Sequence, residues 1–158
     1  MTEAPQLDDD NGRPVESPAQ IEEWAERLRK RLSKPLPDDG AVKTPDSIIH
    51  DLELVQYVAG QNVAVLREAD RTRRAARRAL AKATARATQT ATGKAADIRK
   101  AEIELAVEAE ADAAEDAEIA FTYAKSVAEL TELVKSAVQT QSKQVEITYS
   151  LAGSRRTS

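Results

Sequence analysis

The chain of 158 residues contains no cysteine, one phenylalanine, one tryptophan and five glycines. Without cysteine it forms neither disulfides nor thiolate metal sites. Aromatic residues make up only 3% of the sequence, which is poor material for a sheet or a barrel. No apolar run approaches the length of about eighteen residues that a membrane span needs, and the acidic N-terminus lacks the basic and apolar regions of a signal peptide. We therefore expect a cytoplasmic protein that does not associate with membranes.

Charged residues make up 32% of the chain, and long segments are rich in Ala, Glu, Lys, Arg and Leu. This composition is typical of long helices and coiled coils, so the expected fold class is all-α. The formal net charge of −4 argues against the overall basicity of a general nucleic-acid binder.

The N-terminal part predicts a tail, a helix and a linker. Residues 1–17 are acidic and almost without apolar side chains, so we expect them to be disordered. Ser17 and Pro18 then predict a helix start with a capping box to Gln20. The short amphipathic helix extends over residues 18–34 and carries an apolar stripe of Ile21, Trp24, Ala25, Leu28 and Leu32. Residues 35–44 form a Pro/Gly linker.

Residues 45–152 predict a long antiparallel helical hairpin of coiled-coil type, with its turn near residues 88–94 and a basic tail over 153–158. Thr44 is expected to cap the first arm, which carries a heptad seam of Ile48, Leu52, Val55, Ala59, Asn62, Leu66, Ala69, Arg73, Ala76, Leu80 and Ala83. Asn62 would fix the register of this seam, or else mark an imperfect repeat. Gly60 lies within this arm and marks either a close helix contact or a mild bend, and Gly93 is a candidate C-terminal cap. Alternation from Val145 to Leu151 is strand-like, but no second strand exists to pair with it, so we expect helix there too.

The second arm is expected to begin near Lys94 and to carry a stripe of Ile98, Ala101, Leu105, Ala109, Ala113, Ala120, Tyr123, Val127, Leu130, Val134 and Ala137.

Two blocks of opposite charge flank the predicted turn. The basic block contains Arg67, Arg71, Arg73, Arg74, Arg77, Arg78, Lys82 and Arg86. The acidic block contains Glu102, Glu104, Glu108, Glu110, Asp112, Glu115, Asp116 and Glu118.

A turn near residue 91 makes facing residue numbers add to about 182, which brings charges together at the loop end and apolar residues together at the open end. The facing pairs are Arg78 with Glu104, Arg74 with Glu108, Arg67 with Glu115, Val55 with Val127, Leu52 with Leu130, and Ile48 with Val134. This register leaves residues 138–152 without a facing helix, to be covered by the first helix or by a second subunit.

The candidate interaction residues are Trp24, Arg73, Arg74, Arg77 and Arg78. The arginines either pair with the acidic block or bind phosphates, and Trp24 either anchors the short helix or contacts a partner. His50 is the only histidine, so we expect no metal site, and no sequence motif predicts a catalytic residue or a cofactor.

The stretch from Leu52 to Gly153 resembles small helical-hairpin proteins encoded by actinobacterial phages. The likeness rests on the basic helix, the turn of Thr88–Lys94, the segment Phe121-Thr-Tyr-Ala-Lys125 and the end from Val145 to Gly153. It implies a phage context, and so the host cytoplasm, but no assigned activity.

We expect a non-enzymatic structural or protein-interaction module, such as a phage accessory, scaffold or assembly protein. It would form a homodimer or small homo-oligomer, with a further protein partner that the sequence does not identify. The alternative is a nucleic-acid-associated recombination or replication accessory that uses the basic helix from Arg67 to Arg86.

Overall fold

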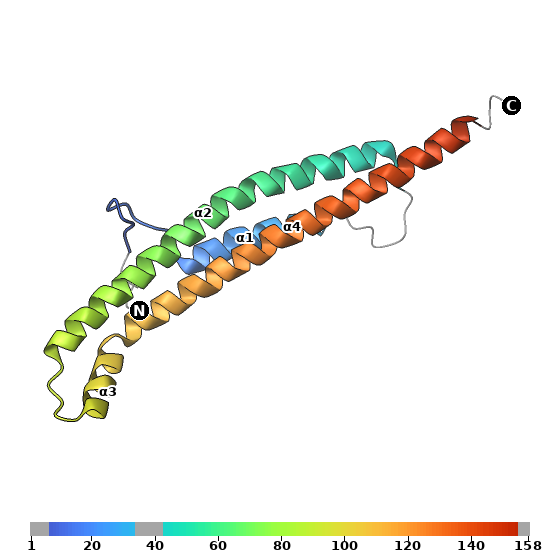
Figure 1. Cartoon of the computed structure of the whole chain (residues 1–158). Coiled ribbons are helices and arrows are strands. Elements are labelled where there is room, and N and C mark those ends of the chain that lie inside the picture. Colours follow the sequence, from blue (N-terminus) through green and yellow to red (C-terminus); the bar gives the residue numbers. More distant parts are fainter. Residues whose placement is uncertain (1–6, 34–42, 155–158) are drawn as a thin grey trace. The chain divides into compact units, whose positions relative to one another are not determined.

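The computed structural model describes residues 7–33 and 43–154, which form an all-α fold (Figure 1). These residues contain four helices: α1 (Pro18–Leu32), α2 (Pro45–Thr90), α3 (Ala96–Ala106) and α4 (Glu108–Ser154). The long helix α2 packs against the long helix α4, which confirms the predicted helical hairpin. The linker before Lys43 and the tail after Ser154 lie outside the described residues. No helix in the described ranges combines the length and apolar character that crossing a membrane demands.

The chain divides into two compact units. The first unit takes in the described residues of Met1–Glu23 together with Val65–Ala124. The second takes in those of Trp24–Ala64 together with Lys125–Ser158. The basic part of α2 and the acidic part of α4 therefore belong to the first unit, and the more apolar parts of both helices belong to the second.

Both predicted helix starts carry their N-caps. The Gln20 backbone N–H donates to Ser17 Oγ at 3.2 Å, and the Ser47 backbone N–H donates to Thr44 Oγ1 at 3.2 Å. Ser47 Oγ in turn accepts from the Thr44 backbone N–H at 3.0 Å, which completes a capping box on α2. The Gln20 side chain donates to Glu23 instead, so the predicted box on α1 forms only in part.

The apolar stripe of α1 is buried at Ile21, Ala25, Leu28 and Leu32. Trp24 lies at the border of this stripe and is only half-buried. It is therefore neither fully enclosed, as a core anchor of the short helix would be, nor fully exposed to a partner.

Only half of the predicted seam of α2 lies on its buried face. Of the six predicted positions that recur every seventh residue, five are buried, namely Ile48, Val55, Asn62, Ala69 and Ala76, and Ala83 is half-buried. The predicted positions between them each lie one residue after a buried position. The structure buries Asp51, Val58, Val65 and Thr72, whereas the prediction was Leu52, Ala59, Leu66 and Arg73. The leucines at 52 and 66 favoured the wrong spacing, since they are apolar but lie at the border of the buried face. Asp51 is tolerated there because the Lys43 ammonium lies 2.5 Å from its carboxylate.

Asn62 does meet the opposite helix within the seam of the second unit. Its Nδ2 donates to Thr131 Oγ1 at 2.6 Å, and Thr131 Oγ1 donates to the Val127 carbonyl at 2.8 Å. Facing residue numbers therefore add to about 193 rather than 182. In the first unit, Arg77 Nη2 lies 2.7 Å from Glu118 Oε2, in agreement with this register to within about two residues.

The register correction changes the pairs predicted at the open end of the hairpin. Val55 lies opposite about residue 138, and both Val55 and Val138 are buried, whereas Leu130 is exposed. Pro45 lies opposite about residue 148, so the predicted overhang of residues 138–152 is reduced to the residues of α4 after about 148.

The register differs because the chain reversal is longer than predicted. The second arm is not one helix from Lys94, since α3 and α4 are separate helices that meet at Val107. Val107, at the junction, is buried. Helix α3 has no buried residue, and Ile98 and Leu105 of the predicted stripe are therefore exposed. The turn and α3 together move the midpoint of the hairpin about five residues beyond 91.

Gly93 contributes space to this turn rather than a left-handed cap. Its φ is not positive, and a Cβ there would lie 2.9 Å from Ile98 Cγ2 and 3.0 Å from the Arg99 backbone nitrogen. Glu102 Oε2 accepts the backbone N–H groups of Thr92 and Gly93, both at 3.1 Å, and so ties α3 to the turn. At Gly60, by contrast, a Cβ would meet nothing within 4 Å, so no close helix contact explains that glycine.

Candidate functional site

Residues 7–17, predicted to be disordered, form an ordered turn in the first unit. The backbone N–H of Val15 donates to the Leu7 carbonyl at 2.9 Å, and that of Asp9 donates to the Arg13 carbonyl at 2.8 Å. Asp9 Oδ1 accepts the backbone N–H groups of Asn11 and Arg13, at 2.8 and 3.0 Å. Gly12 adopts a φ of 69°, which a glycine accepts without strain.

The turn is anchored on α2. Thr72 Oγ1 donates to the Glu16 carbonyl at 2.8 Å, and Val15 and Thr72 are both buried. We call residues 7–16 the N-terminal loop. An acidic segment that was expected to remain in solvent is therefore held against the basic block.

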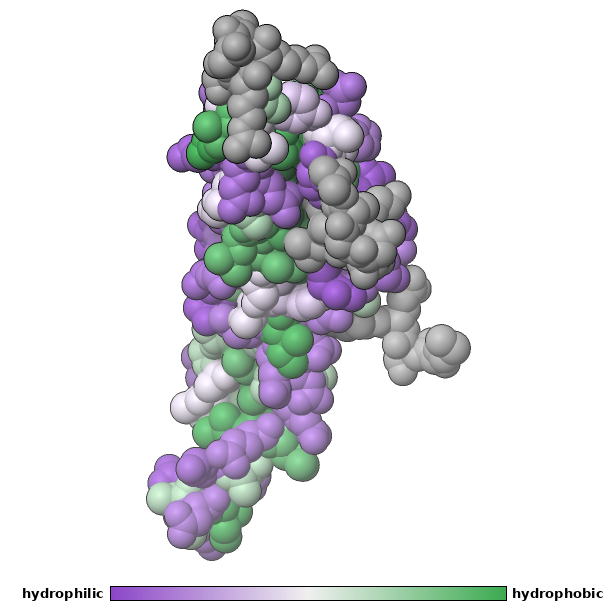
Figure 2. Space-filling model, turned by 90° about the vertical axis from the view of Figure 1, so that its right-hand side faces the viewer, coloured by the Kyte–Doolittle hydropathy of each residue, from purple (hydrophilic) through white to green (hydrophobic). Residues whose placement is uncertain are grey.

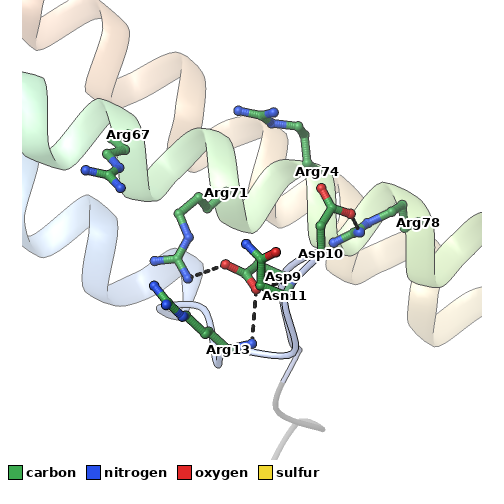
Figure 3. A pocket seen from close by; sticks show the side chains of 8 residues that line it. All are labelled: Asp9, Asp10, Asn11, Arg13, Arg67, Arg71, Arg74 and Arg78. Carbon is green, nitrogen blue, oxygen red and sulfur yellow. Dashed lines mark hydrogen bonds and ion pairs between the residues drawn. The ribbon is translucent and has the colours of Figure 1, made fainter.

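A groove lies between the N-terminal loop and α2 (Figure 3). Its volume is about 310 Å³, near the lower end of the range for ligand pockets. It is lined by Asp9, Asp10, Asn11, Arg13, Arg67, Arg71, Arg74 and Arg78, and we call it the arginine groove. The four helical arginines follow a 4-3-4 spacing and so share one face of α2.

Two of these arginines are occupied by carboxylates of the loop. Arg71 Nη2 lies 2.8 Å from Asp9 Oδ2, and the Arg78 guanidinium pairs with Asp10. The backbone hydrogen bonds from Arg13 and Asn11, together with Arg71, lower the pKa of Asp9 from 3.8 to about 2, against the effect of burial. The hydrogen bond that Arg71 donates to Asp9 raises the pKa of Arg71.

The other predicted arginines are paired elsewhere in the first unit. The Arg73 guanidinium lies 3.8 Å from the centroid of the Phe121 ring and forms ion pairs with Asp70 at 2.7 Å and with Glu118 at 3.6 Å. Arg74 pairs with Asp70 on its own helix, and Arg77 pairs with Glu118. Burial raises the pKa of Asp70, but the hydrogen bonds from Arg73 and Arg74 outweigh it and lower that pKa overall.

The basic and acidic blocks therefore neutralise each other only in part. Glu118 is the member of the acidic block that pairs across the hairpin, while the facing pairs predicted for Arg67, Arg74 and Arg78 do not form. Within residues 7–33 and 43–154, six members of the acidic block make no ion pair, namely Glu102, Glu108, Glu110, Asp112, Glu115 and Asp116. In the basic block, Arg67, Lys82 and Arg86 are exposed and make no ion pair within the described residues.

Charge matching was the signal that could have revealed the arginine groove in the sequence. Asp9 and Asp10 are followed by Asn11-Gly12, a dipeptide typical of tight turns, which could have predicted an ordered loop. The lack of apolar residues outweighed that signal. The loop is held instead by backbone hydrogen bonds and ion pairs, together with the single buried Val15.

A second exposed feature lies on α4 in the second unit. Large apolar side chains remain exposed at Leu130 (37%), Leu133 (69%), Ile147 (58%) and Leu151 (61%). With the exposed residues Ala137, Thr140 and Gln144 they complete a heptad spacing, which we call the outer stripe of α4. Figure 2 shows hydrophobic patches of this kind at the surface of the protein, separated by hydrophilic side chains.

His50 is exposed, and the described residues contain no group of three or more metal-ligating side chains. The chain matches no protein-family model, and neither the curated proteins nor the solved structures contain a significant match to it.

Proposed function

We propose that the chain is a non-enzymatic structural and protein-interaction module that self-associates through the outer stripe of α4. The observation that carries this proposal is the second heptad spacing on α4. One heptad face of this helix is buried at Ala124, Val127, Thr131, Val134 and Val138. The outer stripe runs one residue earlier at each step, so it forms a neighbouring face that can receive a further helix.

The partner that fits the outer stripe is a second copy of α4. The stripe has bulky apolar residues at its two ends and small or polar residues in its middle. In an antiparallel pair, Leu130 of one copy lies opposite Leu151 of the other, Leu133 lies opposite Ile147, and Thr140 lies near the twofold axis. Apolar residues thus meet apolar ones at both ends of a contact about 32 Å long.

Self-association would also bury the exposed apolar side chains of the outer stripe. Burying one leucine fully is worth roughly 1.5–3 kcal/mol, so the exposed leucines and isoleucine of two copies provide a substantial driving force. The resemblance to phage helical hairpins suggests a phage accessory, scaffold or assembly protein as the biological role of such an oligomer.

Single cysteines test the proposed pairing directly, because the natural chain has none. Under mild oxidation, Thr140→Cys is expected to form a disulfide-linked dimer, since residue 140 lies near the proposed twofold axis. Leu151→Cys is expected not to do so, because the two copies of residue 151 lie at opposite ends of the contact. Cross-linking of Leu151→Cys with itself would indicate a parallel pair instead.

Sedimentation tests the self-association itself. The natural chain is expected to be a dimer at micromolar concentration, and Leu133→Gln with Ile147→Gln is expected to be monomeric with unchanged helix content. The matched control is Ile49→Gln with Val63→Gln, which alters two exposed apolar residues of α2 in the same unit and is expected to remain dimeric. A natural chain that sediments as a monomer would overturn the proposal.

A further inference from the structure

We propose that the arginine groove binds the phosphate backbone of a nucleic acid, and that Asp9 and Asp10 occupy the groove until that ligand displaces them. This site is independent of the outer stripe of α4.

The arrangement of the arginines favours a linear polyanion. Arg67, Arg71, Arg74 and Arg78 line the groove from one face of α2. From the first to the last, this row covers about 16 Å of the helix axis at 1.5 Å per residue. A nucleic-acid strand presents one phosphate per 3.4 Å of its axis, so roughly four or five phosphates span the same length. A row of guanidinium groups suits such a ligand better than it suits a single compact phosphate.

The groove also keeps positive charge that the loop does not neutralise. Five arginines line it, against the two carboxylates of Asp9 and Asp10, and Arg71 also pairs with Glu68 of α2 at 2.6 Å. Arg67 is exposed and makes no ion pair within the described residues, and Arg74 is paired only with Asp70 of its own helix. In Figure 3 neither arginine is bonded to the loop, and the Arg74 side chain points away from it. The cavity of about 310 Å³ leaves room for anionic groups next to them.

The loop can leave the arginines without the rest of the fold changing. Its tip touches the helical arginines through the pairs Asp9–Arg71 and Asp10–Arg78. The second pair is open to solvent, with 68% of the Asp10 side chain exposed. Exposed pairs are weak and are screened by salt. The contacts at Val15 and Glu16 lie farther along the chain, so they can hold the base of the loop while its tip moves.

The first experiment removes the competing charges and measures binding. Fluorescence anisotropy with a labelled DNA strand of about 20 nucleotides compares the natural chain with Asp9→Asn/Asp10→Asn at several salt concentrations. The loop variant is expected to bind about three- to thirtyfold more tightly, because the pairs Asp9–Arg71 and Asp10–Arg78 no longer compete with the phosphates. Its plot of log affinity against log salt is expected to steepen by up to about 1.4, the value for two further phosphate contacts on a single strand.

A matched control separates the groove from net charge. Asp112→Asn/Asp116→Asn removes the same two charges from exposed residues of the same unit that make no ion pair in the described part of the chain. This variant is expected to bind DNA no more than about twofold more tightly than the natural chain does. Equal gains in the two variants, or no DNA binding by either, would overturn the proposal.

A second pair of variants locates the contact in the loop-variant background. Arg67→Gln, inside the groove, is expected to weaken DNA binding about fivefold or more, as the loss of one phosphate contact predicts. Arg86→Gln, on the same helix outside the groove, is expected to change it less than twofold. Both arginines are exposed and unpaired in the described residues, so helix content by circular dichroism is expected to stay the same. Equal losses would show diffuse attraction to the basic block and would contradict a site in the groove.

Two further probes separate other anions from nucleic acid. Inorganic tripolyphosphate is expected to compete with DNA only at a concentration far above that of the oligonucleotide, because it spans less of the arginine row. Vesicles containing anionic lipid are expected to bind the loop variant and the control variant alike. Tripolyphosphate that competes at DNA-like concentration, or vesicles that select the loop variant while DNA does not, would overturn the assignment to nucleic acid.

Discussion

Asn62 and Thr131 form a polar pair inside the buried seam of the second unit, with 5% and 1% of their surfaces exposed. Thr131→Val keeps the shape of the side chain but leaves the Asn62 amide without its partner. We expect this change to lower the free energy of unfolding by about 1–3 kcal/mol. Asn62→Val combined with Thr131→Val is expected to recover most of that loss, because no buried donor is then left unpaired. Urea unfolding of the single and double variants provides the measurement.

The outcome distinguishes two roles for Asn62. If the double variant is as destabilised as the two single variants added together, the pair contributes through packing and not through its hydrogen bond. If the double variant is stable but forms mixed oligomers, Asn62 acts chiefly to fix the register, as a polar residue in a coiled-coil seam does.

The stability of the fold at acid pH depends on Asp9. Its backbone hydrogen bonds and Arg71 lower its pKa from 3.8 to about 2, so its ionised form stabilises the fold above about pH 4. That contribution is lost as the pH falls toward 2, because the carboxylate then becomes protonated in the folded state as well. Asp9→Asn is expected to melt below the natural chain at pH 6, and the gap is expected to close near pH 2. A gap for Asp9→Asn that stays the same between pH 6 and pH 2 would contradict the role of the loop.

The pairing of α2 with α4 in the first unit can be tested through Arg77 and Glu118. They lie 2.7 Å apart with side chains 60% and 41% exposed, so their coupling is expected to be about 0.2–1 kcal/mol at low salt. A double-mutant cycle with Arg77→Glu and Glu118→Arg measures this coupling, and the reversed pair is expected to restore the contact between positions 77 and 118 but not that of position 118 with Arg73. A cycle on Arg74 and Glu108, which face each other only in the register that the sequence predicted, is expected to give no coupling. The opposite result would favour the earlier register.

The sequence was sufficient for the elements and insufficient for their alignment. Ser17 and Thr44 signalled both helix starts, because N-caps depend on a few adjacent residues. The register depends on the length of the turn, and the break at Val107 has no Gly or Pro to mark it. The heptad seam of α2 failed for a related reason, since Leu52 and Leu66 lie at the edge of the buried face and Thr72 at its centre. Which residues of α2 are buried depends on the other segments that pack against it, as the hydrogen bond from Thr72 to the Glu16 carbonyl illustrates.

The arginine groove, too, could be predicted from the sequence only in part. The arginines of the basic block could be identified from their charge and helical spacing. For their partners the sequence offers only charge matching and the Asn11-Gly12 turn, since Asp9 and Asp10 lie more than sixty residues away in the chain, and the fold places them on α2. The structure thus assigns Arg73 and Arg77 to contacts within the hairpin, and Arg71 and Arg78 to the groove that the N-terminal loop closes.

For the protein as a whole, self-association through the outer stripe predicts that its melting temperature depends on concentration. Unfolding of a dimer into two chains is opposed by mass action, so each tenfold rise in concentration adds about 0.7 kcal/mol per chain to the stability. For a domain of this size we expect the melting temperature to rise by about 1.5–3 °C per tenfold rise in concentration. Leu133→Gln with Ile147→Gln is expected to melt at a lower temperature that does not change with concentration. Circular dichroism over a hundredfold range of protein concentration measures the melting temperatures of the natural chain and of the variant. If the melting temperature of the natural chain stays constant over that range, each copy is stable with its outer stripe exposed.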